Sequence, residues 1–408
     1  MWDRIQSLFF ANRPNSYWNS DAPETKRRAL IVGIDYYSHV NSLRGCVADA
    51  KAMHEVLSRH DGPENAPSSL NYTCELLLGT QKGPEVNRKV LRSKWLDLFE
   101  DPSEKDRKFK GDVLFYFAGH GAINDYGGHL VTQESVPKDD EIGVEMEALM
   151  LLANRKSAAR SVNVIIDACH SGEFGNPPDE DGLTKLKKGI SILMASLPAE
   201  KAKEVGGRGV FTSLVVSALE GGGADVLGNV SAASIFAYAE AALGPQQQRP
   251  MYKTHASDWE VIRRCQPEVS LDDLGLLPNY FPESESHYQM DPSFEHTELE
   301  NYMEGKDNHL GEPGTISEDD IELCKNNIKI FKLFKRYQVV GLLEPVKEQM
   351  KPGNENDLYW AAIDSKPVRL TRLGQFYQNL ALNNRLTDGQ DRNLQTLGEY
   401  HAQNRSTF

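Results

Sequence analysis

Cysteine is scarce in this 408-residue chain, and long apolar segments are missing. Five cysteines are too few, and odd in number, for a disulfide framework, which favours a reducing compartment. No apolar run reaches the roughly 18 residues of a membrane-spanning helix. The apolar run 8–11 near the N-terminus is too short for the core of a signal peptide. We therefore expect a cytoplasmic globular protein with no membrane partner.

A general basic excess is also missing, since the net charge is −14. Between residues 266 and 320 the sequence has 15 acidic residues and one basic residue, so this segment accounts for the whole acidic excess. The rest of the chain is close to neutral, whereas nucleic-acid binding generally needs a basic face. We therefore do not expect nucleic-acid binding by the main body of the protein.

Short apolar runs alternate with helical patterns over residues 29–265. Runs that are apolar on both faces are typical of central strands in a parallel sheet. Their alternation with helices predicts βαβ units and a doubly wound α/β fold. The expected strands are Ala29–Ile34, Cys74–Leu78, Val113–Phe117, Val162–Ile166 and Ile190–Ala195. The expected helices are Val47–Leu57, Pro84–Phe99, Val144–Leu152, Val210–Leu219 and Ala232–Leu243.

Composition divides the chain into four segments. Residues 1–28 form an N-terminal extension, and residues 29–265 form the α/β domain. Residues 266–320 have no sustained period, which predicts an acidic linker or a partly ordered arm. Residues 321–408 contain 13 basic and 9 acidic residues and two amphipathic helical stripes. This last segment predicts a small, helix-rich accessory domain whose layout resembles winged-helix modules.

Two expected strands end in glycine-containing turns that carry reactive side chains. His120 and Gly121 follow one strand, and Cys169 follows another. Sites in open α/β sheets lie beyond the carboxyl ends of the strands. A cysteine attacks as the thiolate, and a nearby histidine sets that protonation state. An amide N–H in a glycine turn can stabilise a developing oxyanion. The pattern therefore predicts a nucleophilic site built from Cys169 and His120.

These motifs resemble those of the caspase-like cysteine peptidases, in particular the metacaspases and their bacterial relatives. The resemblance implies a mostly parallel sheet flanked by helices. It implies that Cys169 is the nucleophile, that His120 is the general base, and that the amides of Gly121 and Cys169 form the oxyanion hole. The matching segments are 43–50, 117–121, 167–172 and 209–212.

The resemblance also places Asp49 and Asp167 at the two acids of the metacaspase S1 pocket. Two carboxylates favour a cationic Arg or Lys as the P1 side chain of a protein or peptide substrate. Caspase-like enzymes are often processed in the loop after the nucleophile, which predicts self-cleavage at Lys185, Lys187 or Lys188.

No metal or other cofactor is expected. The segment after His120 lacks the long acidic insert of the metacaspases, and a calcium site needs six to eight oxygen ligands. We therefore expect that calcium is not strictly required.

Simpler interpretations compete with these assignments. Asp49 could cap the helix that begins near Ala50, and Asp167 could accept hydrogen bonds from backbone amides at a strand end. Buried cysteines are usually inert, small apolar groups. That is the expectation for the other cysteines, Cys46, Cys74, Cys265 and Cys324.

The expected function is therefore a cysteine endopeptidase with a Cys-His dyad, specific for Arg or Lys. Resemblance alone suggests a bacterial stress, cell-death or defence pathway. We also expect a regulatory partner that binds through residues 321–408. The alternative is an inactive caspase-like scaffold that binds protein or nucleic acid through the same C-terminal domain.

Overall fold

The chain divides into two compact units between Gln266 and Pro267. The computed structural model describes residues 27–61, 68–124, 127–136, 142–156, 158–168, 186–195, 204–205, 208–244, 249–256 and 260–386. The predicted extension 1–28 thus lies almost wholly outside the described residues. Within the described residues, no helix combines the length and the apolar character needed to cross a bilayer.

Six strands form the central sheet of the first unit. They are β1 Arg27–Ile34, β2 Thr73–Gly79, β3 Asp112–Ala118, β7 Ser161–Asp167, β8 Ile190–Met194 and β12 Met251–His255. Their order is β12-β8-β7-β3-β1-β2. Five strands run parallel, whereas β12 pairs antiparallel with β8 at one edge. The five parallel strands match the five apolar runs, because both faces of the sheet are covered.

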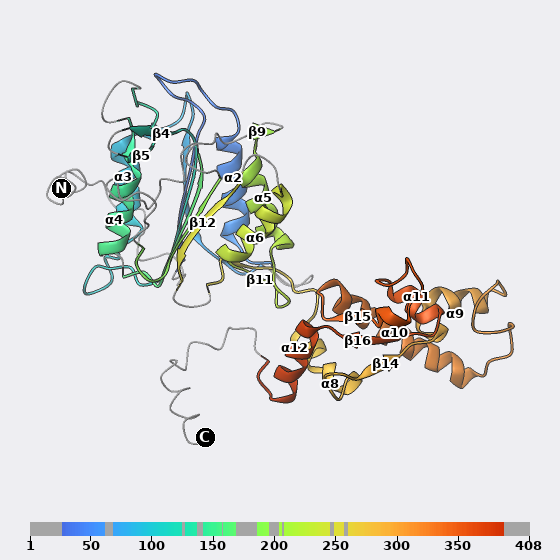
Figure 1. The fold of residues 1–408 in the computed structure, drawn as a ribbon. Coiled ribbons are helices and arrows are strands. Elements are labelled where there is room, and N and C mark those ends of the chain that lie inside the picture. Colours follow the sequence, from blue (N-terminus) through green and yellow to red (C-terminus); the bar gives the residue numbers. More distant parts are fainter. Residues whose placement is uncertain are drawn as a thin grey trace, which may run out of the picture. The chain divides into compact units, whose positions relative to one another are not determined.

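Helices cover both faces of this sheet (Figure 1). The helices are α2 Cys46–Ser58, α3 Arg88–Asp97, α4 Met146–Lys156, α5 Val210–Ser217 and α6 Ala232–Leu243. Side chains of α3 and α4 pack in the apolar core on one face, and those of α2, α5 and α6 pack in the core on the other. The predicted doubly wound, mostly parallel sheet flanked by helices is confirmed.

Several short strands of the first unit were not expected from the sequence. They are β4 Gly121–Asn124, β5 Gly127–Leu130, β6 Val144–Glu145, β9 Glu204–Val205, β10 Arg208–Gly209, β11 Asn229–Val230 and β13 Arg263–Arg264. They form small antiparallel sheets, in the orders β4-β5-β6, β10-β9 and β11-β13. Strands of two to four residues are too short to show a hydrophobic period.

The second unit contains helices and a three-stranded antiparallel sheet of order β14-β16-β15. Its strands are β14 His287–Gln289, β15 Leu343–Pro345 and β16 Pro367–Leu370. Its helices are α7 Leu271–Gly275, α8 Leu277–Tyr280, α9 His296–Met303, α10 Glu318–Val339, α11 Leu358–Ile363 and α12 Arg372–Leu382. Short 3-10 turns lie at Pro292–Phe294 and Lys347–Gln349.

The interpretation of residues 266–320 as a linker or arm is wrong. Strand β14 from this segment pairs with β16, and Phe281 and Phe294 are buried in the second unit. Two of its acidic side chains pair with basic residues of α10, since Asp273 lies 3.0 Å from Arg336 and Glu295 lies 3.4 Å from Lys335. Isolated buried side chains in very short elements produce no period, which explains why the sequence pattern suggested disorder.

Candidate active site

The register of the central sheet sets the ends of β3 and β7 side by side. Ala118, the last residue of β3, pairs with Asp167, the last residue of β7. Beyond this pair, the Gly119 N–H donates to the Asp167 carbonyl at 3.2 Å. His120 follows immediately, whereas the predicted nucleophile Cys169 lies outside the described residues. The two predicted reactive turns therefore start from adjacent points on the carboxyl edge of the sheet.

The loop after β1 holds His120 through two contacts. The His120 Nε2 atom lies 2.7 Å from the carbonyl oxygen of Asn41. A carbonyl can only accept, so Nε2 carries the proton, and the lone pair of the neutral ring is on Nδ1. The His120 backbone N–H donates to the Tyr37 hydroxyl oxygen at 2.8 Å. Sequence reasoning missed Tyr37 and Asn41, because a contact to a backbone N–H and a backbone carbonyl leave no motif in the sequence.

Tyr37 also explains the glycine before His120. Its ring centroid lies 4.8 Å from that of the His120 imidazole, and its side chain is buried. A Cβ atom at Gly119 would lie 2.7 Å from the Tyr37 hydroxyl oxygen, which is too close for any larger residue. Burial raises the pKa of Tyr37 well above its usual value, so the phenol stays neutral.

The amide of Gly121 points away from its neighbouring strand. Gly121 pairs with Leu130 of β5, and the flanking Val131 N–H donates to the His120 carbonyl at 3.0 Å. This pattern marks a non-hydrogen-bonded pair in an antiparallel ladder, in which both N–H groups point outward. Because β4 is an edge strand of its small sheet, the Gly121 N–H is directed away from that sheet. Its predicted part in an oxyanion hole stays a prediction.

Asp49 and Asp167, called the carboxylate pair below, both lie against the start of α5. The Asp49 Oδ2 atom accepts the Gly209 N–H at 2.8 Å. The Asp167 Oδ2 atom accepts the Thr212 hydroxyl at 2.7 Å and its N–H at 3.2 Å. Negative charge is favourable at the N-terminus of a helix. A Cβ atom at Gly209 would lie 2.3 Å from Asp167 Oδ2 and 3.1 Å from Asp49 Oδ2, so both carboxylates converge on one glycine.

These contacts also decide between the simpler interpretations. Asp49 does not cap α2, because the N-cap of that helix is Gly45 and Asp35 accepts the N–H of Cys46 at 2.9 Å. Asp167 does accept a backbone amide, as the simpler interpretation expected. The structure thus brings the two acids together, and both are buried. Their role in binding substrate stays a prediction.

A buried tyrosine continues the polar network of the carboxylate pair. The Tyr116 hydroxyl lies 2.6 Å from the Thr212 hydroxyl, which itself donates to Asp167. Burial, followed by the charges of Asp167 and Asp49, raises the pKa of Tyr116 well above its usual value. The phenol therefore stays protonated and donates to Thr212, which fixes the direction of the Thr212 hydroxyl towards Asp167.

Comparison with known families identifies the first unit. The family model described as the caspase domain matches residues 26–259. The chain belongs to the caspase family. Metacaspase-3 of Arabidopsis thaliana is 28% identical over 160 residues, which cover 37% of this chain and 41% of the relative. Metacaspase-1 of Schizosaccharomyces pombe is 24% identical over 233 residues, which cover 52% of each protein.

The chain thus spans about half or less of the length of these curated relatives. Among solved structures, caspase-1 from Spodoptera frugiperda matches with a TM-score of 0.39 and 13% identity, over 62% of this chain and 96% of that one. A protein from Geobacter sulfurreducens, GSU0716, matches with a TM-score of 0.40 and 15% identity, over 60% and 98% of the two chains.

The other four cysteines of this caspase domain and its C-terminal unit are free thiols. Burial raises the pKa of Cys74 to about 12 and that of Cys265 to about 11, and it also raises the pKa of Cys324. These three thiols are therefore protonated at neutral pH and are poor nucleophiles. Among the described residues, no group of three or more His, Cys, Asp or Glu side chains could hold a metal ion.

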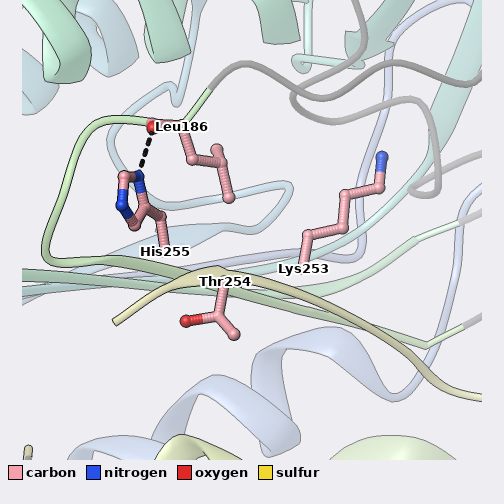
Figure 2. Close-up of a pocket in the computed structure, with 4 residues that line it drawn as sticks. All are labelled: Leu186, Lys253, Thr254 and His255. Atoms are coloured by element: carbon pink, nitrogen blue, oxygen red, sulfur yellow. Dashed lines mark hydrogen bonds between the residues drawn. The ribbon is translucent and has the colours of Figure 1, made fainter. Parts of the chain in front are cut away.

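A pocket of about 390 Å³ lies along the edge strand β12 of the caspase domain (Figure 2). Leu186, Lys253, Thr254 and His255 line it, and the His255 Nδ1 atom lies 3.0 Å from the Leu186 carbonyl oxygen. The predicted cleavage residues Lys187 and Lys188 come next in the chain and are exposed, whereas Lys185 lies outside the described residues. The pocket is therefore associated with the end of the predicted processing loop, and His120 does not line it.

Proposed function

We propose that this chain is a cysteine endopeptidase that cleaves proteins after Arg or Lys. The observation that carries the proposal is the placement of His120 at the shared end of β3 and β7, with Nε2 facing the Asn41 carbonyl. This tautomer leaves Nδ1 as the basic atom of His120, and the strand β7 that leads to Cys169 ends next to β3. Family membership and the metacaspase relatives support the reaction class.

The proposed reaction is acyl transfer in two steps. His120 takes the proton of the Cys169 thiol, and the resulting thiolate attacks the scissile carbonyl carbon. The His120 imidazolium then gives this proton to the leaving amine as the C–N bond breaks. Water, deprotonated by His120, attacks the acyl-enzyme and releases the acid together with the thiolate. The outward N–H of Gly121 and the N–H of Cys169 would donate to the oxyanion in both steps.

Labelling with a peptide electrophile that carries Arg at P1 tests this function. The proposed enzyme binds one equivalent of label per chain at Cys169, and labelling competes with an Arg-peptide reporter. The competing hypothesis is an inactive scaffold that acts through residues 321–408. A scaffold would stay unlabelled at concentrations that saturate a cysteine peptidase, and that result would reject the endopeptidase.

Specificity should follow the charge of the carboxylate pair. We expect a substrate library to return Arg or Lys at P1 and no cleavage after Asp. Asp167→Asn should lower kcat/KM for basic reporters by more than about tenfold, because one carboxylate of a buried charged contact is lost. The Asn oxygen can still accept the Thr212 N–H, which preserves the start of α5.

Thr212→Val provides the matched control for that substitution. It removes the hydroxyl donor to Asp167 while it keeps both negative charges, and we expect a smaller loss of kcat/KM than in Asp167→Asn. An equal loss in both variants would assign the effect to packing at α5. A library that returns acidic or aromatic P1 residues would reject the pocket assignment.

Self-processing in the loop after Cys169 is a further part of the proposal. The Lys187 N–H donates to Asn154 at 2.8 Å, and the Gly189 N–H donates to the His255 carbonyl at 2.7 Å. These bonds oppose the extended conformation that a protease needs around Lys187 and Lys188. We therefore expect the new N-terminus at Leu186, after Lys185, when purified wild type is incubated and its fragments are sequenced.

The Cys169→Ala chain is the control for this experiment and should remain intact. A wild-type chain that is fully active while it stays uncut would show that self-cleavage is not needed for activity. The proposal also includes a cytoplasmic location, which the few cysteines favour, and a regulatory partner for the C-terminal unit. A bacterial stress, cell-death or defence role rests on the resemblance alone. Independence from calcium is proposed as well, and activity that chelator removes and calcium restores would contradict it.

A further inference from the structure

A basic side chain of the protein itself already contacts the carboxylate pair. Arg208 lies in β10, and its Nε atom is 3.3 Å from Asp49 Oδ1. The Asp49 side chain is 2% exposed, whereas the Arg208 side chain is 40% exposed. The ion pair therefore joins a buried anion to a partly exposed arginine, of which the Nη2 atom is buried. A guanidinium is also the group that a P1 arginine would present to the same carboxylates.

We propose that Arg208 is a resident cation of the carboxylate pair, which the basic side chain of a substrate must displace. In this role Arg208 is a specificity-determining residue, because it sets how tightly basic side chains bind. The inference rests on the proposed function, since it concerns the same pocket. It adds a competitor to that pocket, and the competitor belongs to this chain.

The contacts around Arg208 allow it to leave without disrupting the carboxylate pair. Asp49 keeps the Gly209 N–H on its other oxygen, and Asp167 keeps both bonds from Thr212. Ion pairs with a solvated partner contribute little to stability, because water screens the interaction. Moreover, β10 pairs with β9 over only two residue pairs, and such a short ladder opens readily.

Competition with Arg208 should also affect discrimination between Arg and Lys at P1. A P1 guanidinium can form two parallel hydrogen bonds with a carboxylate. It therefore makes the same kind of contact that Arg208 makes with Asp49. A P1 ammonium is a point charge, and it displaces the resident guanidinium less well. The presence of Arg208 should therefore increase the preference for Arg over Lys.

Kinetics of the full-length Arg208→Gln chain test the inference. We expect KM for an Arg-P1 reporter to fall by up to about fivefold, the range expected for loss of a partly exposed ion pair. The ratio of kcat/KM for the Arg reporter to kcat/KM for the Lys reporter should fall towards one. In Arg208→Lys, which keeps the positive charge, KM for the Arg-P1 reporter should stay close to the wild-type value. Arg249→Gln is the matched control, since it breaks an Arg–Glu240 pair of 2.9 Å whose side chains are 58% and 43% exposed.

A binding measurement separates this inference from the proposed function. Benzamidine, a small amidinium probe, should bind Arg208→Gln several-fold more tightly than the wild type by calorimetry, whether or not either protein cleaves peptides. Equal benzamidine affinity in the two folded proteins, or an unchanged KM, would overturn the resident-cation proposal. A wild type that binds benzamidine but cleaves no reporter would instead reject the endopeptidase, and comparison with Arg208→Gln would still decide the role of Arg208.

Discussion

Replacing Cys169 with alanine is expected to lower peptidase activity by at least about 10³-fold while the protein stays folded. The substitution removes the sulfur that forms the acyl-enzyme. His120→Ala should lose activity to a similar extent, because the group that sets the thiolate and protonates the leaving amine is gone. Steady-state cleavage of an Arg-P1 reporter measures both losses.

Cys74→Ala is the control for the nucleophile. The Cys74 thiol is kept protonated by its raised pKa of about 12, so activity and label stoichiometry should stay close to those of the wild type. Cleavage that survives in Cys169→Ala, and is equally present in an identically purified His120→Ala sample, would show that the activity belongs to another protein. Cleavage that survives in Cys169→Ala but is lost in His120→Ala would mean that the nucleophile is a different residue.

Asp112→Ala is expected to destabilise the first unit by about 2–4 kcal/mol. Asp112 starts β3, is 4% exposed and accepts from Arg160 Nε at 2.8 Å and from the Ser161 hydroxyl at 3.0 Å. Its other oxygen lies 3.3 Å from Arg27 Nε. The carboxylate therefore joins the beginnings of β1, β3 and β7 at the edge opposite to the candidate site. Its loss leaves the mostly buried Arg27 with one anionic partner fewer.

Chemical denaturation should show this loss as a lower midpoint for the unfolding of the first unit. The comparison is Asp106→Asn, which removes an exposed charge 3.5 Å from Lys110 and should leave the unfolding midpoint almost unchanged, because water screens exposed ion pairs. A shift no larger than that of Asp106→Asn would mean that the Asp112 network contributes nothing net to folding. Activity per folded molecule should be unchanged, since Asp112 lies at the far end of the strand.

The central sheet could be predicted because its strands carry a strong signal. Ala29–Ile34 and Val113–Phe117 are apolar at every position, which only a strand covered on both faces requires. The edge strand β12 carries no such signal, because Lys253, Thr254 and His255 are partly or fully exposed. The prediction of a linker at residues 266–320 was wrong because the segment is ordered without showing a periodic pattern. Each of its short elements buries only one or two side chains, and ion pairs with other segments offset part of its negative charge.

The candidate site divides in the same way. His120, Cys169 and Gly121 could be singled out because reactive side chains beside glycines follow buried strands. Asn41 and Tyr37 could not, because the first contributes a backbone carbonyl and the second a contact to a backbone N–H. Neither interaction depends on a residue pattern that a sequence displays.

The sequence by itself determined the class of fold and the types of reactive side chain, because burial on two faces and glycine turns are local properties. Only the tertiary structure decided that Asp49 and Asp167 meet at Gly209, that Asn41 sets the proton on His120, and that Arg208 reaches the carboxylate pair. Each of these contacts joins segments far apart in the chain. They form because the parallel register of the sheet brings the carboxyl ends of its strands to one edge, where the start of α5 packs against them.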